Sequence, residues 1–326
     1  MNKKIKVLIS THPFGTADPR AAEMLASQGW EIEFNPYGRK IGLDELKPFL
    51  PEVDALIAGT EGMNEDALKF ADNLKLISRV GIGLDGLDWA AIKKRNIEVA
   101  YTPDAPSLSV AELVIGLMIN LTRGINISNS CMHSKKWYRY MGSELSEKTI
   151  GVIGLGRVGK KVAQLLKPFN CRIIVNDIEP DLKFAEEYGL NLVEKEEIYE
   201  KSDIVTLHVP LTSLTKNLIN ENAFKKMRHD AFVINTSRGS VIDEISLYNA
   251  LAANKIKGAA IDVYNEEPYK GCLVGLDNII LTSHMGSCTD ESRKAMEIGA
   301  AEAVVDFFKG RKLKNRVPDE LRNNEA

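Results

Sequence analysis

The chain has 326 residues, a net charge of −3, and a composition that is 44% hydrophobic and 27% charged. At roughly 100–200 residues per domain, this length predicts two globular domains. The composition excludes disordered, collagen-like and disulfide-scaffold proteins, and the slightly acidic balance provides no basic field for binding a nucleic acid.

The first third of the chain alternates short apolar segments with helical segments. We predict strands at residues 6–9, 31–34, 55–58, 76–80 and 98–100, and helices at residues 19–28, 63–70 and 88–95. This alternation indicates a parallel sheet with helices on both faces.

A long helix is predicted at residues 109–123, with Ser109 as its N-cap and Glu112 three positions later. A second strand–helix series follows, with strands at 150–153, 172–176, 204–209, 231–235, 259–263 and 279–282, and a last helix at 290–308. These strands are apolar throughout, as expected for central parallel strands that are buried on both faces.

The sequence predicts a cytoplasmic protein with no membrane segment. Its most apolar stretch, residues 110–121, contains Glu112 and is too short to span a bilayer, and residues 1–10 lack the long apolar region of a signal peptide. The four cysteines form no CxxC pair, so we expect free thiols and no metal site.

A glycine-rich turn predicts a dinucleotide site. Gly154, Gly156 and Gly159 follow an apolar strand and open a helix, and Asp177 ends the next strand eighteen residues beyond Gly159. These glycines permit a tight turn and close approach of a pyrophosphate, whose phosphates face the amides of the helix N-terminus. The alternative is a glycine turn without a ligand, which the strand, helix and acid in their proper places disfavour. Asp177 would bind the adenosine ribose and repel a 2′-phosphate, so we predict NAD rather than NADP.

Three strand-end loops contain side chains that suit hydride transfer to a 2-keto acid. Arg238, Glu267 and His284 each follow an apolar strand, so we expect them at the carboxyl edge of one sheet, where such sheets bind ligands. The imidazole can protonate the forming alkoxide, the carboxylate can orient the imidazole, and the guanidinium can bind the acid. Each residue alone is typical of a surface ion pair, but the three beside a dinucleotide site predict catalysis.

With these residues in place, the sequence resembles the D-isomer-specific 2-hydroxyacid dehydrogenases, most closely the D-3-phosphoglycerate dehydrogenase-like branch in a short form without a regulatory domain. The matching motifs lie at residues 78–85, 110–113, 154–159, 235–240, 262–268 and 283–287. The resemblance implies an α/β protein with a flavodoxin-like substrate domain, residues 1–100 and 287–326, and a doubly wound Rossmann NAD-binding domain, residues 101–286. It also implies a homodimer, with a dimerisation arm at about residues 110–145, and a small 2-hydroxy or 2-keto acid as substrate.

The resemblance also implies roles for single residues. Arg238, Glu267 and His284 match the catalytic set, and Ile82 and Gly83 match a loop whose amides hold the substrate carboxylate. Further cofactor positions that it implies, beside the three glycines and Asp177, are Arg157, Val158, Val209, Pro210, Thr236, Ser237, Asp262 and Gly286.

The substrate positions match the phosphoglycerate-specific pattern only in part. Arg79 matches a phosphate-binding arginine of that branch. Arg139 matches a phosphate-binding arginine that the partner subunit donates, and Trp137 matches a residue that reaches towards the neighbouring subunit's site. The loop at residues 58–62, however, reads Ala-Gly-Thr-Glu-Gly where such members often have an arginine, and Glu61 would repel a phosphate. Cys288 stands where the family usually has a small residue, and we assign it no catalytic role.

We therefore expect a D-3-phosphoglycerate dehydrogenase-like enzyme, with a glyoxylate or hydroxypyruvate reductase or a D-lactate type as the alternative. Formate-specific relatives pair their histidine with glutamine, which Glu267 argues against. Phosphite-specific relatives share the Glu–His pair and stay open. A non-catalytic NAD-sensing corepressor is the alternative of another class, and turnover of NADH with 2-keto acids would discriminate it.

Overall fold

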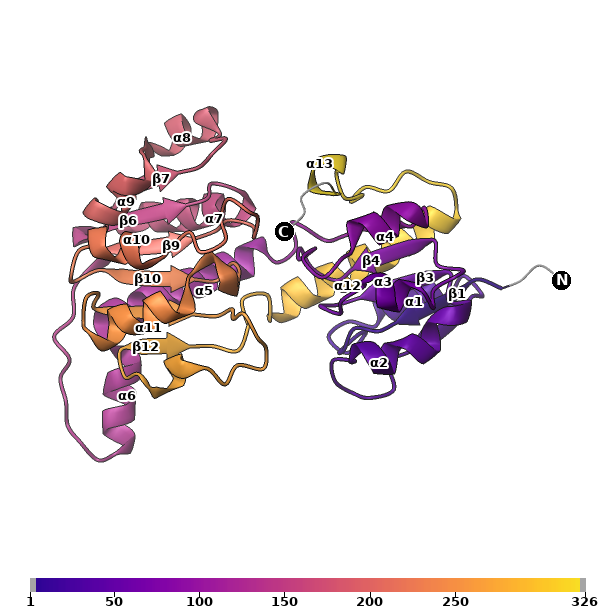
Figure 1. Ribbon diagram of the computed structural model, residues 1–326, viewed down its shortest axis with the longest axis horizontal. Coiled ribbons are helices and arrows are strands. Elements are labelled where there is room, and N and C mark those ends of the chain that lie inside the picture. Colours follow the sequence, from indigo (N-terminus) through magenta and orange to yellow (C-terminus); the bar gives the residue numbers. More distant parts are fainter. Residues whose placement is uncertain (1–3, 323–326) are drawn as a thin grey trace. The chain divides into compact units, whose positions relative to one another are not determined.

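The computed structural model describes residues 4–322, which divide into two compact units (Figure 1). The first unit comprises residues 4–106 and 288–322, and the second unit runs from Ser107 to Ser287. The chain therefore leaves the first unit once and returns to it with its last helices.

Five parallel strands form the sheet of the first unit, in the order β2-β1-β3-β4-β5. The strands are β1 (Lys6–Ile9), β2 (Glu31–Phe34), β3 (Ala55–Ala58), β4 (Leu76–Arg79) and β5 (Glu98–Ala100). This is the strand order of flavodoxin-like folds, so the predicted fold of this part is confirmed.

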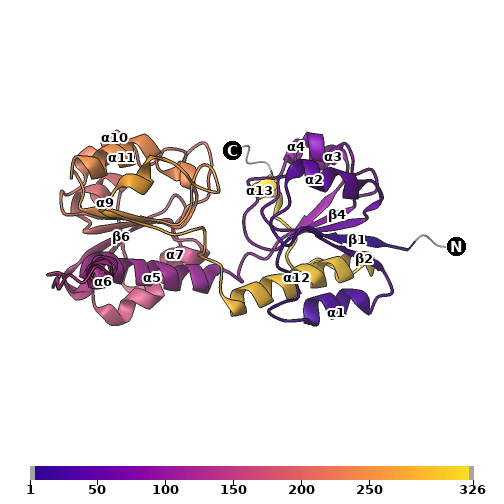
Figure 2. The ribbon, with the colours of Figure 1, turned by 90° about the horizontal axis from the view of Figure 1, so that it is seen from below.

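Helices cover both faces of this sheet. They are α1 (Arg20–Ala26), α2 (Leu43–Leu46), α3 (Glu65–Leu68), α4 (Trp89–Lys94), α12 (Asp290–Phe308) and α13 (Asp319–Arg322), with a 3-10 helix at Lys47–Glu52. Because side chains alternate along a strand, Val7 and Ile9 of β1 enter the core under α1 and α12, whereas Leu8 enters the core under α2, α3 and α4. Figure 2 shows α1 and α12 on one face of this sheet and α2, α3 and α4 on the other.

Seven parallel strands form the sheet of the second unit, in the order β12-β11-β10-β9-β6-β7-β8. The strands are β6 (Thr149–Ile153), β7 (Arg172–Asn176), β8 (Asn191–Leu192), β9 (Ile204–Leu207), β10 (Phe232–Asn235), β11 (Gly258–Ile261) and β12 (Ile279–Leu281). Counted from β6, this is the doubly wound Rossmann order with one further strand beside β11, so this prediction is also confirmed.

The helices of the second unit again form two layers. They are α5 (Ser107–Arg123), α6 (Ile125–His133), α7 (Arg157–Leu166), α8 (Leu182–Tyr188), α9 (Lys195–Lys201), α10 (Glu221–Lys226) and α11 (Glu244–Ala252), with 3-10 helices at Leu145–Glu147, Lys167–Phe169, Gly239–Val241 and Cys272–Gly275. One core lies under α5, α7 and α8, and the other lies under α9, α10 and α11. Figure 2 shows α5 and α7 on the opposite side of the sheet from α9, α10 and α11.

Two local features differ from the sequence prediction. The long helix α5 begins at Ser107, so Ser109 lies inside its first turn and the predicted N-cap is wrong. Pro106 stands just before the helix, where a fixed φ suits a helix start. The exposed edge strand β8 was not predicted, because its two residues form no apolar run.

Within residues 4–322, no single helix is long and apolar enough to cross a membrane. Helices α5 and α6 together reach that length and composition, but they are bent by 65° at Gly124. One face of α5 is packed into the core of the second unit, through Ala111, Val114 and Met118.

Candidate functional site

The loops that follow β11 and β12 bring His284 and Glu267 together. Nδ1 of His284 lies 2.9 Å from each carboxylate oxygen of Glu267. Because a carboxylate only accepts hydrogen bonds, this contact places a ring hydrogen on Nδ1 and leaves Nε2 for another partner. Both side chains are partly exposed, so the pair is accessible to a ligand.

Asp262 holds the backbone of the His284 loop. His284 has a φ of +52°, a backbone conformation that residues other than glycine rarely adopt. Its N–H donates to the carbonyl oxygen of Asp262 at 2.8 Å. The buried carboxylate of Asp262 accepts from Met285 N–H and Gly286 N–H, both at 2.9 Å, and from the Thr282 hydroxyl at 2.6 Å. These contacts lock the imidazole in place, a role that the sequence alone did not reveal for Asp262.

Arg238 follows β10, the strand next to β11. Its carbonyl oxygen accepts from the Asn235 side chain at 2.8 Å, and its Nη1 donates to the Ser237 carbonyl at 2.6 Å. The next residue, Gly239, packs so closely that an added Cβ would lie 2.2 Å from the backbone of Tyr264. The arginine loop thus rests against the loop that contains Glu267, because β10, β11 and β12 are neighbours in the sheet.

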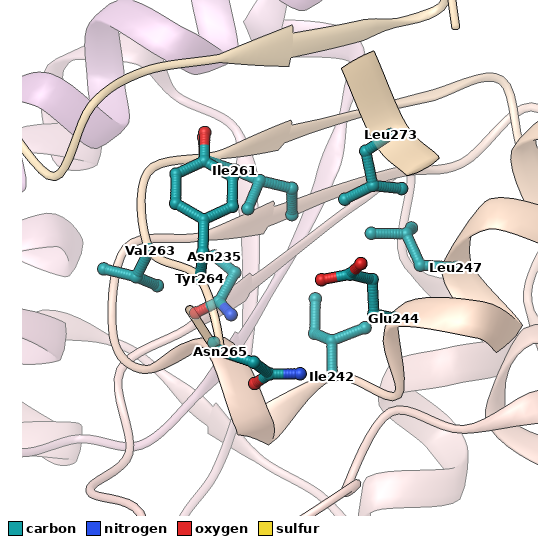
Figure 3. Close-up of a pocket in the computed structure, with 10 residues that line it drawn as sticks. Asn235, Ile242, Glu244, Leu247, Ile261, Val263, Tyr264, Asn265 and Leu273 are labelled. Carbon is teal, nitrogen blue, oxygen red and sulfur yellow. The ribbon is translucent and has the colours of Figure 1, made fainter. Parts of the chain in front are cut away.

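A small pocket lies behind these loops, between the strand ends and α11 (Figure 3). Figure 3 shows the carboxylate of Glu244 directed into the pocket between Ile242 and Leu247. The Tyr269 hydroxyl donates to this carboxylate at 3.0 Å, and burial raises the pKa of Tyr269, so the phenol keeps its proton.

Tyr264 links this pocket to the His–Glu pair. Its ring stacks on Tyr269 with centroids 4.3 Å apart, and its backbone N–H donates to Glu267 at 3.2 Å. Its hydroxyl donates to the carbonyl of Thr282, 2.7 Å away, two residues before His284. Burial and the nearby Asp262 raise the pKa of Tyr264 to about 12, so the phenol stays a donor.

The glycine turn lies between β6 and α7. Gly154 has a φ of +97°, and an added Cβ there would lie 2.5 Å from the carbonyl oxygen of His208. An added Cβ at Gly159 would lie 2.0 Å from the carbonyl oxygen of Gly154, whereas the same position at Gly156 faces open space. The first and third glycines therefore close the turn, and the second leaves room in front of α7, which begins at Arg157 and includes Val158.

Asp177 is tied to this turn. Its Oδ2 accepts from Leu155 N–H at 2.5 Å and its Oδ1 accepts from Glu179 N–H at 2.9 Å. The carboxylate therefore stands beside the glycines, at the end of the strand adjacent to β6.

A buried hydroxyl follows β10, which lies two strands from β6 in the sheet. The hydroxyl of Thr236 is buried, and no residue in the described part of the chain forms a hydrogen bond with it. Its neighbour Ser237 donates to Asn235 through both its N–H and its hydroxyl. At the loop after β9, the Val209 side chain lies against Gly154. In the same loop, the carbonyl oxygen of Pro210 accepts from the Thr215 hydroxyl at 2.6 Å. The open Gly156 and the unpartnered Thr236 fit a bound dinucleotide.

His208 is a further residue at the turn, and no motif in the sequence marks it. Its Nε2 lies 3.0 Å from the Thr206 hydroxyl, and burial lowers its pKa to about 3. The imidazole therefore stays neutral and adds no charge beside the glycines.

In the first unit, the predicted substrate loop is held by Arg79 and Thr102. Arg79 is 4% exposed, and its guanidinium donates to the carbonyl oxygens of Glu61 at 2.9 Å and Gly83 at 3.3 Å. Gly81 has a φ of +139° and donates to the Thr102 hydroxyl at 2.8 Å, and the next residue, Ile82, is exposed. The buried guanidinium of Arg79 thus forms hydrogen bonds with the backbone of the loops at Glu61 and Gly83.

The remaining predicted positions lie on exposed segments. Trp137 is 81% exposed and Arg139 is also exposed, and both line a hollow with Arg123 and Met132 of the α5–α6 region. Cys288 is an exposed cysteine that forms no disulfide among the described residues, and it lies directly before Thr289, the N-cap of α12.

Comparisons with known proteins agree with this geometry. The family model described as "D-isomer specific 2-hydroxyacid dehydrogenase, NAD binding domain" matches residues 115–286. The D-3-phosphoglycerate dehydrogenase of Methanocaldococcus jannaschii is 39% identical over 84% of this chain and 53% of its own length. This chain therefore spans about half the length of that relative.

Two further relatives are matched over most of their own length, 87% and 98%. The hydroxypyruvate reductase of Thermotoga maritima is 36% identical over 80% of this chain and 87% of its own length. The structure of a D-lactate dehydrogenase from Aquifex aeolicus, solved with NAD and lactic acid, superimposes with a TM-score of 0.85 at 25% identity, over 96% of this chain and 98% of that one. The chain belongs to the D-isomer specific 2-hydroxyacid dehydrogenase family, and its second unit contains the NAD-binding domain of that family.

Proposed function

We propose that this protein is an NAD-dependent oxidoreductase that interconverts a D-2-hydroxy acid and the corresponding 2-keto acid. The observation that carries the proposal is the 2.9 Å contact between His284 Nδ1 and Glu267, at the carboxyl edge of the sheet that bears the glycine turn. Parallel sheets of this kind bind ligands at that edge.

His284 is the proton donor in the reduction direction. When bound, NADH supplies the hydride that reduces the carbonyl carbon. His284 Nε2 gives a proton to the carbonyl oxygen as negative charge develops on it, and takes the proton back during oxidation. Glu267 fixes the tautomer and the orientation of the imidazole, so that Nε2 faces the reacting oxygen.

Arg238 binds the acid and polarises the carbonyl. A guanidinium offers donors in a plane, which matches the carboxylate and the adjacent oxygen of a 2-keto acid. As the family resemblance implies, we assign the amides of Ile82 and Gly83 to binding a substrate carboxylate. Trp137 and Arg139 would act from a partner subunit, so we propose that the working form is a homodimer in the cytoplasm.

The second unit would hold the dinucleotide through the glycine turn, Arg157, Val158 and Thr236. The carboxylate of Asp177 would accept hydrogen bonds from the ribose hydroxyls. It would repel the negative charge of a 2′-phosphate, so NAD is the preferred cofactor. The hydrogen bond that Asp177 accepts from Leu155 N–H, within the turn, supports this placement.

The proposal is tested by mixing the purified protein with NADH and a panel of 2-keto acids: glyoxylate, pyruvate, hydroxypyruvate and 3-phosphohydroxypyruvate. Oxidation of NADH, measured by its absorbance, is the expected result with at least one acid. Tight NADH binding without turnover of any of them would overturn the proposal and favour an NAD-sensing protein.

A further inference from the structure

Strand β10 ends on a buried asparagine, Asn235, three residues before Arg238. The residue is 1% exposed, and it pairs in register with Leu207 of β9 and Ile261 of β11 on either side. Its carbonyl oxygen accepts from Asp262 N–H at 3.0 Å. The backbone of Asn235 is therefore fixed at the carboxyl edge of the sheet, and the residue lines the small pocket of Figure 3.

The side-chain hydrogen bonds that Asn235 forms within residues 4–322 all go to the turn that follows it. Its Oδ1 accepts from the N–H and the hydroxyl of Ser237, at 3.0 and 2.8 Å, and its Nδ2 donates to the carbonyl of Arg238 at 2.8 Å. An asparagine oxygen that accepts from the N–H two residues later forms an Asx turn, which fixes the direction of the backbone. An amide suits this position, because Ser237 requires an acceptor and the carbonyl of Arg238 requires a donor.

The same turn holds one nitrogen of the guanidinium. Nη1 of Arg238 donates to the carbonyl of Ser237 at 2.6 Å, so the side chain folds back on the backbone that Asn235 organises. Beyond Arg238, the hydroxyl of Ser240 donates to Oδ1 of Asn265, in the loop after β11, at 2.7 Å. The arginine loop is thus held on both sides, by Asn235 at the end of its own strand and by Asn265 of the neighbouring loop.

We infer that Asn235 is a positioning residue that sets where the guanidinium of Arg238 meets the carboxylate of the substrate. The inference rests on the proposed function, in which Arg238 binds the acid. Bidentate recognition requires the guanidinium nitrogens and the acceptor oxygens to face each other in one plane, so a small displacement of the turn weakens it. The effect of Asn235 on the reaction should therefore pass through Arg238.

Asn235→Asp tests this role with a side chain of nearly the same size. Aspartate retains an acceptor for Ser237, but its second oxygen faces the carbonyl of Arg238 without a proton to donate. We expect kcat/KM for the best acid of the panel to fall about tenfold or more, mostly through KM. The NADH dissociation constant should stay within about twofold of the wild type, because the glycine turn is untouched. Steady-state kinetics and fluorescence titration measure the two effects.

A double-mutant cycle shows whether the effect passes through Arg238. In an Arg238→Ala background, Asn235→Asp should lower kcat/KM by less than about twofold, because the guanidinium that it positions is absent. The same cycle is read from the dissociation constant of oxamate, an unreactive analogue of a 2-keto acid, so it does not depend on residual turnover. A full tenfold effect in the Arg238→Ala background would overturn the inference.

Asn278→Asp is the matched control. Asn278 is a partly buried asparagine directly before β12, at the opposite edge of the same sheet, and its Nδ2 donates to the carbonyl of Leu251 at 3.1 Å. The control should lower the midpoint of urea unfolding about as much as Asn235→Asp does, and leave kcat/KM within about twofold of the wild type. If Asn235→Asp weakens NADH binding as much as it lowers kcat/KM, its effect is general damage to the unit and the inference is wrong.

If Asn235→Asp fails to fold, Asn235→Ala replaces it in the same cycle, because alanine adds no charge to the core. Wild-type kinetics in the folded variant would overturn the role of Asn235 while the proposed dehydrogenase activity stands. A wild type that turns over none of the acids would overturn the proposed function, and the inference with it.

Discussion

At the scale of single residues, the account depends on how the His–Glu pair is held. The backbone of His284 is fixed by Asp262, and the carbonyl two residues earlier accepts from the Tyr264 hydroxyl. Tyr264 touches neither substrate nor cofactor in this account, so it is a positioning residue.

Replacing Tyr264 with phenylalanine removes its hydrogen bond to Thr282 and keeps the stacked ring. We expect kcat to fall about three- to tenfold with KM nearly constant, and stability to fall by about 0.5–1.5 kcal/mol. Steady-state kinetics and urea unfolding measure these effects. Tyr269→Phe is the control, because its hydroxyl contacts Glu244 instead. A stability loss with unchanged kcat would remove the positioning role.

We propose that Asp177 selects NAD over NADP. Asp177→Ala removes the charge that would repel a 2′-phosphate, so kcat/KM with NADPH relative to NADH should rise at least tenfold. The absolute rate with NADH should fall, since the contact with Leu155 is also lost. Glu187→Ala removes an exposed charge on α8 and should leave the ratio unchanged. An unaltered ratio in Asp177→Ala would place the ribose elsewhere.

At the scale of elements, the glycine turn couples a strand, a loop and a helix. Gly159→Ala inserts a Cβ 2.0 Å from the carbonyl of Gly154, so the turn must open. We expect a loss of about 1–3 kcal/mol of stability and at least tenfold weaker NADH binding, measured by urea unfolding and fluorescence titration.

Gly116→Ala is the control for this change. Gly116 is exposed on α5, where an added Cβ meets open space, and alanine should stabilise the helix by about 0.5–1 kcal/mol without changing NADH affinity. Wild-type NADH affinity in Gly159→Ala would show that the turn does not need its third glycine.

At the scale of the whole molecule, the sequence predicted the two sheets well because their strands are apolar runs between turns. Residues 6–9, 55–58 and 172–176 were predicted with the bounds that β1, β3 and β7 have. Central strands buried on both faces leave an unmistakable pattern. The two-residue edge strand β8 was missed because it forms no apolar run, and the start of α5 was misplaced because Ser109 has the side chain of an N-cap, although Pro106 precedes the helix.

The candidate site was predictable only where it depends on strand order. Neighbouring parallel strands bring their carboxyl-end loops together, which is why His284 and Glu267 could be expected to meet. The contacts of Asp262, Tyr264 and Arg79 were not predictable, because they join residues through tertiary packing that no local pattern encodes.

The central claim is that His284 gives the proton to the reacting oxygen. The most direct measurement is the NADH-dependent reduction rate of His284→Ala with the best acid of the panel, alongside its NADH dissociation constant. We expect a kcat lower by about 10²–10⁴-fold and an NADH affinity within about twofold of the wild type. A variant that reduces the acid at the wild-type rate would contradict the account.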